Sequence, residues 1–196
     1  MRRVGLFGGT FDPPHVGHLA AAEWAREQLK LDRVVFMPAG TPPHKRRRDL
    51  SRAEARIAMT RLAVRGQSAF TVSTLEARRR GPSFTVDTLR QLQRRDPKAR
   101  LFLLLGADSL DDFSSWHEPN EILRLATLAV AVRPGARARA RAGRSRRRVL
   151  WLDNPGLALS SSAIRARARA GRSVRYLVPD AVLRYLTRHR LYREPA

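Results

Sequence analysis

Short apolar runs alternate with helix-forming stretches along most of this chain, and that alternation most constrains what it can fold into. The apolar runs are strand-length and occupy 3–7, 33–39, 70–77, 100–107, 127–133 and 148–153. Several are apolar at consecutive positions, which is typical of strands buried on both faces. Strands that alternate with helices predict a parallel sheet with right-handed crossovers.

Four stretches carry helix patterns: 15–30, 51–64, 84–95 and 178–192. Ser51 and Glu54 have the spacing of a capping box, and Pro179 is suited to the first turn of a closing C-terminal helix. The sequence therefore predicts an α/β fold: a Rossmann-like, doubly wound parallel sheet with helices on both faces and a C-terminal helix. Ligands should bind at the carboxyl ends of the strands, near the point where the strand order reverses.

The chain is 196 residues long and shows no linker or repeat, so it is interpreted as one domain, 1–196. The arginine-rich segment 135–148 is interpreted as an exposed, flexible loop. The stretch "MRRVGLFGG" is not expected to act as a signal peptide, because its apolar run is short, and no later apolar run is long enough to span a membrane. The absence of cysteine excludes disulfides and thiolate zinc sites, and the cytoplasm is the expected compartment. The oligomeric state stays open, a homo-oligomer included.

The charge is strongly positive, with 39 lysines and arginines against 17 aspartates and glutamates, a formal net charge of +22. Such a charge is typical of nucleic-acid-binding proteins, but a positive field also attracts polyphosphates. The bases are mostly arginines set among alanines, a bias that codon composition can produce. No specific nucleic acid is therefore expected as a partner.

The segment "GGTFDPPHVGH" (8–18) follows the first predicted strand and opens the first helix. Gly8 and Gly9 allow backbone amides to approach a ligand closely, and a helix N-terminus favours anions. His15 and His18 are three residues apart, so both imidazoles lie on one face. The alternative is a tight turn with two solvated histidines. The combination favours a phosphate cradle.

A second candidate anion site is "LSSSAIRARARAG" (159–171), where three serines precede a helix and Arg165 follows one turn later. Hydroxyls, N-terminal amides and a guanidinium all suit phosphate. Taken alone, a serine cap beside a solvated arginine is more often structural. Together, two helix N-termini can hold both ends of a triphosphate.

With "GGTFDPPHVGH" and "SSSAIR" in this order, the chain resembles the nucleotidyltransferase superfamily related to class I aminoacyl-tRNA synthetases. "PAGTPPHK" (38–45), "GPSFTVDTL" (81–89) and "GADSLDDFSSWHE" (106–118) make it most similar to the bacterial nicotinate-nucleotide adenylyltransferases. The resemblance spans residue 1 to about 190. It implies transfer of the adenylyl group of ATP to nicotinate mononucleotide in NAD biosynthesis. Mg²⁺ is then expected as a cofactor bound chiefly through the ATP phosphates, with no dedicated protein metal site.

The resemblance also implies roles for individual residues. His15, His18 and Arg165 are the expected catalytic residues. The expected ATP-binding residues are Gly8, Gly9, Thr10, Phe11, His15, His18, Gly106, Asp108, Ser161, Ser162 and Arg165. The expected acceptor-binding residues are His44, Lys45, Thr85, Trp116 and His117, with the indole of Trp116 stacked on the pyridine ring and the amides of Thr85 and His117 receiving the carboxylate.

This sequence departs from the family pattern at three positions: Phe84 and His117 stand where tyrosine is usual, and Ser162 stands where threonine is usual. Two alternative functions remain at this point. One is a related adenylyltransferase of the pantetheine-phosphate type, which would not be expected to carry "PPHK" or "SSWHE". The other is a basic RNA-binding protein, although the chain lacks an RNP-like aromatic motif.

Overall fold

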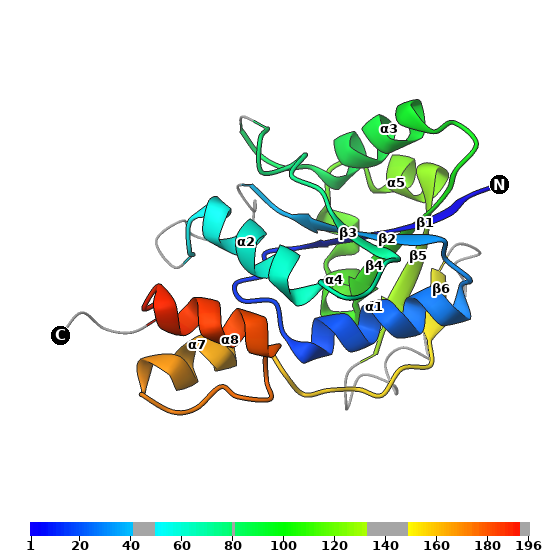
Figure 1. The fold of residues 1–196 in the computed structure, drawn as a ribbon. Coiled ribbons are helices and arrows are strands. Elements are labelled where there is room, and N and C mark those ends of the chain that lie inside the picture. The colour runs from blue at the N-terminus through cyan, green and yellow to red at the C-terminus, as the bar shows by residue number, and fades with distance from the viewer. Residues whose placement is uncertain (41–49, 80, 133–148, 193–196) are drawn as a thin grey trace.

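The computed structural model describes residues 1–40, 50–79, 81–132 and 149–192. Its centre is a six-stranded sheet with the order β3-β2-β1-β4-β5-β6, and every strand is parallel to its neighbours (Figure 1). The predicted parallel α/β fold is confirmed. The strands are β1 (Arg3–Gly9), β2 (Arg33–Pro38), β3 (Phe70–Val72), β4 (Arg100–Gly106), β5 (Ala126–Ala131) and β6 (Val149–Leu152).

The strand order reverses at β1, which pairs with β2 on one side and with β4 on the other. Crossovers run outward in both directions from this pair, so a crevice opens between the carboxyl ends of β1 and β4. Gly9 ends β1 and Gly106 ends β4. Both motifs that follow these strands therefore begin at the same edge of the sheet.

Helices cover both faces of the sheet. The helices are α1 (Val16–Gln28), α2 (Ala53–Ala63), α3 (Thr85–Arg95), α4 (Ala107–Asp111), α5 (Pro119–Leu125), α7 (Ser161–Arg169) and α8 (Asp180–Arg188), with a 3₁₀ turn η2 (Phe113–Ser115). Helix α1 lies on one face and α3 and α5 lie on the other (Figure 1). No helix among these described segments is long and apolar enough to cross a membrane.

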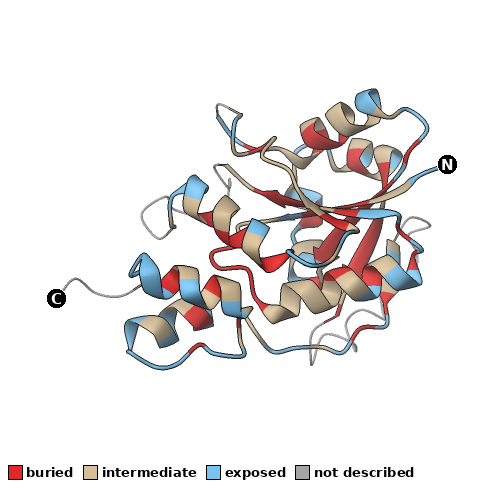
Figure 2. Cartoon of the chain, in the orientation of Figure 1, coloured by how far each residue is buried: buried red, intermediate tan, exposed pale blue. Residues whose placement is uncertain are grey.

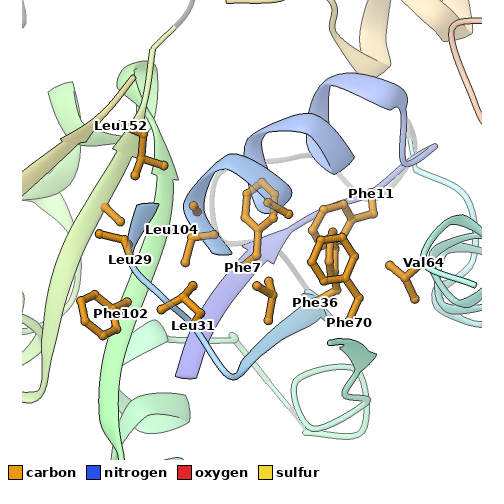
Figure 3. Close-up of a cluster of buried hydrophobic side chains, with 14 residues drawn as sticks. Phe7, Phe11, Leu29, Leu31, Phe36, Val64, Phe70, Phe102, Leu104 and Leu152 are labelled. Atoms are coloured by element: carbon orange, nitrogen blue, oxygen red, sulfur yellow. The ribbon is translucent and has the colours of Figure 1, made fainter. Parts of the chain in front are cut away.

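Three buried clusters hold these layers together (Figure 2). Alanines of α1 pack on an aromatic group from the strands that includes Phe7, Phe36 and Phe102 (Figure 3). On the opposite face, Val86 and Leu89 of α3 pack against the sheet residues of the second cluster. The third cluster joins α2, α7 and α8 beside the sheet. This last packing fixes the C-terminal helices next to the loop that follows β1.

Two local predictions are wrong. The strand expected over 70–77 ends at Val72, because the chain turns where the amide of Arg78 bonds the carbonyl of Thr74 at 3.0 Å. The expected Ser51–Glu54 capping box is absent: α2 begins at Ala53 after Arg52, with no side-chain cap. The amide of Ser51 instead bonds Oδ2 of Asp12 at 3.0 Å. The arginine-rich segment 135–148 lies outside the described residues.

Candidate active site

A cavity of about 720 Å³ opens at the carboxyl ends of β1 and β4. It is lined by residues from both halves of the sheet and from the loops that follow the strands. Ten of the residues predicted from sequence line it: Gly8, Gly9, Thr10, His15, His18, Thr85, Gly106, Asp108, Trp116 and His117. The cavity therefore brings together residues that are about a hundred positions apart in the chain.

The two histidines meet at the start of α1. Their rings stack, with centroids 3.6 Å apart and planes inclined by 27°. The backbone amide of His15 donates to Nδ1 of His18 at 3.2 Å. Because Nδ1 accepts this bond, a neutral His18 carries its proton on Nε2, which is the nitrogen that can donate to a ligand.

The loop between β1 and α1 shapes the wall beside these rings. A Cβ placed on Gly8 would meet nothing within 4 Å, so this position faces open cavity. A Cβ on Gly9 would lie 2.9 Å from the ring of Phe11, which leaves no room for a side chain there. Phe11 itself is buried in the core and contacts His18 edge-on, with ring centroids 5.1 Å apart. Its ring supports His18 and is not among the cavity-lining residues.

Helix α7 presents the second predicted anion site beside the same loop. Ser160 caps the helix by accepting from the amide of Ala163 at 3.2 Å. Ser161 donates to the carbonyl of Pro13 at 2.9 Å, and Nη1 of Arg165 donates to the carbonyl of Asp12 at 2.8 Å. The Nε of Arg165 is buried without a hydrogen-bond partner among the described residues, and Ser162 is exposed. The three predicted residues Ser161, Ser162 and Arg165 are not part of the cavity lining, although Ser161 and Arg165 bond the loop that follows β1.

Two residues that the sequence analysis did not single out hold this loop in place. Asp12 is fully buried and accepts from the hydroxyl of Tyr192 at 2.5 Å as well as from the amide of Ser51. Burial and the neighbouring Asp12 raise the pKa of Tyr192 above its ordinary value. Asp12 therefore joins the cradle to the start of α2 and to the chain that follows α8.

Arg56 is the other. Its side chain is only 2 % exposed, and its guanidinium donates to four carbonyls, those of Thr10, Ala39, Gly40 and Ser51, at 2.7–3.1 Å. Burial lowers the pKa of Arg56. Its position has a sequence signal, since Arg56, Met59 and Ala63 share the buried face of α2 at the i, i+3, i+7 spacing.

The other end of the cavity is aromatic. Trp116 follows η2 and packs on Phe113, with ring centroids 5.5 Å apart. His117 stacks on Phe84, with centroids 4.4 Å apart and planes inclined by 31°. Thr85 is the first residue of α3, so its amide has no partner within that helix. His44 and Lys45 lie outside the described residues.

A buried carboxyl group also lines this end. Glu76 is 6 % exposed, and its Oε1 accepts from the hydroxyl of Thr88 at 2.9 Å. Burial raises the pKa of Glu76 to about 7, while the Thr88 bond and the nearby Arg79 act in the opposite direction. A turn in place of the expected strand brings Glu76 here, so the linear pattern gave no sign of it.

Comparisons with known proteins place the chain in a family. Residues 6–167 match the model of the cytidylyltransferase-like family. A protein of Thermomicrobium roseum named "Probable nicotinate-nucleotide adenylyltransferase" is 47 % identical, over 98 % of this chain and 92 % of its own length. One of Thermus thermophilus with the same name is 48 % identical, over 97 % and 100 %. The nicotinic acid mononucleotide adenylyltransferase of Plasmodium falciparum, solved with NaAD, is 17 % identical and superposes with a TM-score of 0.83 over 98 % of both chains, which shows a shared fold.

Proposed function

The chain belongs to the cytidylyltransferase-like family and, within it, to the nicotinate-nucleotide adenylyltransferases, and we propose which of its residues carry out their reaction. The enzyme transfers the adenylyl group of ATP to nicotinate mononucleotide and releases pyrophosphate, a step of NAD biosynthesis. The observation that best supports the assignment of residues is the single cavity with a histidine pair at one end and Trp116 at the other. A nucleotide donor and a pyridine acceptor need two such ends.

At the donor end, the phosphates of ATP lie against Gly8, Gly9 and Thr10, at the N-terminus of α1. The open space beside Gly8 accommodates them, and the backbone amides and helix dipole favour their charge. His18 donates from Nε2 to the α-phosphate, and His15 supports the bridging oxygens. Gly106 and Asp108, at the end of β4, contact the ribose.

The β- and γ-phosphates extend toward α7. Ser161, Ser162 and Arg165 stabilise them there and then stabilise the departing pyrophosphate. The bond from Nη1 of Arg165 to the carbonyl of Asp12 supports this role, since it holds the guanidinium beside the loop that follows β1. Phe11 contributes by fixing the ring of His18.

At the acceptor end, the indole face of Trp116 attracts the cationic pyridinium ring. The amides of Thr85 and His117 receive the nicotinate carboxylate. His44 and Lys45, in the basic sequence "PPHK", neutralise the phosphate of the mononucleotide.

The reaction is a displacement at the α-phosphorus. A phosphate oxygen of the mononucleotide forms a bond to that phosphorus, and the bond to pyrophosphate breaks, with its electron pair leaving on pyrophosphate. The attacking oxygen is already anionic, so no general base is required. Catalysis then consists of alignment and stabilisation of negative charge.

Mg²⁺ fits this donor set as an ion that arrives with ATP. The groups around the proposed phosphate position are amides, imidazoles and hydroxyls, which bind anions, and a small hard cation keeps several waters and few protein ligands. When bound to the phosphates, Mg²⁺ neutralises part of their charge.

We further propose that the enzyme works in the cytoplasm, without a nucleic-acid partner.

An acceptor comparison tests this function. The protein is incubated with ATP, Mg²⁺ and nicotinate mononucleotide, and pyrophosphate and the dinucleotide product are measured. Nicotinamide mononucleotide and phosphopantetheine serve as alternative acceptors. We expect rapid turnover of the acid and much slower turnover of the amide. Equal rates on the two mononucleotides would refute the acid preference, and turnover of phosphopantetheine alone would refute the function.

A further inference from the structure

Two contacts join α3 and its N-cap residue to the segment that precedes α5, at the acceptor end of the cavity. We propose that Arg90 and Glu118, helped by the stacked rings of Phe84 and His117, are positioning residues that set the spacing of the Thr85 and His117 amides. They thereby determine acceptor affinity and the preference for an acid over an amide. This inference rests on the proposed function and concerns how its acceptor site is built.

The first contact is a bidentate ion pair. Nη1 and Nη2 of Arg90 donate to the two carboxylate oxygens of Glu118 at 3.0 and 2.6 Å. Nε of Arg90 also lies 3.7 Å from a carboxylate oxygen of Glu121, one turn further along α5. The bond from Arg90 lowers the pKa of Glu118 below its ordinary value. Because both Nη atoms of the planar guanidinium are bonded, the pair fixes the orientation of the Glu118 carboxylate relative to Arg90 as well as its distance.

The second contact is the stack of Phe84 on His117. Phe84 immediately precedes Thr85, and His117 immediately precedes Glu118. The amide of Thr85 therefore directly follows one residue of this stack, and the amide of His117 belongs to the other. Because Arg90 stands on the same helix that Thr85 begins, any displacement of the His117 loop changes the distance between the two amides.

The backbone of Glu118 shows why the loop needs to be held. Its φ and ψ are 51° and 58°, the left-handed region, which a residue with a Cβ adopts at a cost of about 1 kcal/mol. The loop reverses there before Pro119 begins α5. The ion pair opposes relaxation of this conformation, which sets the orientation of the His117 peptide.

The spacing of two N–H donors explains selectivity. A carboxylate offers two acceptor oxygens and satisfies both donors, whereas a carboxamide brings one acceptor and an NH₂ that opposes an N–H. A site of fixed donors therefore rejects the amide through an unpaired group. If the donors can move apart, the amide fits without that conflict and the discrimination falls.

The test measures KM for nicotinate mononucleotide, nicotinamide mononucleotide and ATP, together with kcat, in Arg90→Ala, Glu118→Gln and the exchange R90E/E118R. Arg94→Ala is the matched control, since Arg94 is an exposed arginine one turn further along α3 with no ion pair among the described residues. Loss of an exposed ion pair changes binding by up to about fivefold. We expect Arg90→Ala to raise the acceptor KM by about that factor and to lower the acid-to-amide ratio of kcat/KM, with the ATP KM unchanged.

Partial recovery of the ratio in the exchanged variant supports the inference. Kinetics of Arg90→Ala equal to those of Arg94→Ala would overturn it, as would an equal rise in the KM of ATP. Thermal unfolding checks folding, and if Arg90→Ala does not fold, Arg90→Lys and Glu118→Gln carry the same test. Failure of the wild-type protein to use nicotinate mononucleotide at all would refute the proposed function instead, so the two failures are distinguishable.

Discussion

Glu76 gives a stability prediction whose sign follows from its environment. Its side chain is buried at the wall of the cavity, and desolvation raises its pKa from 4.5 to about 7. Folding therefore favours the protonated acid. Its contribution to stability is fully present below about pH 4.5 and is lost as the pH rises through about 7, because the ionised form must then be buried.

The magnitude follows from the same pKa values. At about 1.4 kcal/mol for each pKa unit, a rise from 4.5 to about 7 corresponds to about 3 kcal/mol of unfolding free energy above pH 8. Glu76→Gln keeps an oxygen that can accept from the hydroxyl of Thr88 but never ionises. We expect this variant to be more stable than wild type by about 3 kcal/mol at pH 9 and by less than about 1 kcal/mol at pH 5.

Thermal unfolding between pH 5 and pH 9 measures this difference. For a chain of this length, 3 kcal/mol corresponds to a rise in Tm of about 6–12 °C. The matched control is Glu54→Gln, at an exposed position of α2. A stability difference for Glu76→Gln that does not grow with pH would refute the assignment of a buried, mostly neutral carboxyl group.

Substitutions at three further positions test the cavity and its support. His18→Ala should lower kcat by about 100-fold or more, the effect of removing a donor that stabilises transition-state charge, whereas exposed His189→Ala should leave kcat unchanged. Trp116→Ala should raise the acceptor KM by about 3- to 30-fold, measured with ATP saturating, and an unchanged KM would place the pyridine ring elsewhere. Arg56→Met should lower the unfolding free energy by about 3–5 kcal/mol in denaturant titrations, because four buried carbonyls lose their donor. Arg56→Lys should restore little of the lost unfolding free energy, since an ammonium cannot reach all four carbonyls. Wild-type stability in either variant would contradict a structural role for Arg56.

Much of the fold was predictable because its signals are local. Buried parallel strands are continuously apolar, and each of the six predicted runs overlaps a strand of the sheet. The run at 70–77 was the exception in length, because only Phe70–Val72 pairs with β2. Its later residues turn instead and carry Glu76 to Thr88 on α3. Apolar composition alone does not distinguish these two outcomes.

The candidate site was predictable where its residues form a contiguous motif, and less so where distant residues support that motif. The glycines and histidines after β1 form a contiguous motif, and the structure stacks His15 on His18 at one wall of the cavity. The distant partners of the residues that support that motif were not predictable from sequence neighbours. Asp12 reaches Tyr192, which is 180 positions away. Arg56 donates to the carbonyl of Thr10, which is 46 positions away.

The sequence by itself determined the alternation of strands and helices, the contiguous glycine and histidine motif at residues 8–18 and the resemblance that identifies the family. These features depend on residue type and spacing within short segments. The tertiary structure decided which segments meet: the strand order reverses between the paired strands β1 and β4 at the centre of the sheet, and this brings Thr85, Trp116 and the histidine pair to one cavity. It also decided the burial of Glu76 and the pairing of Arg90 with Glu118. Desolvation and long-range ion pairs depend on packing between distant segments, which no local pattern records.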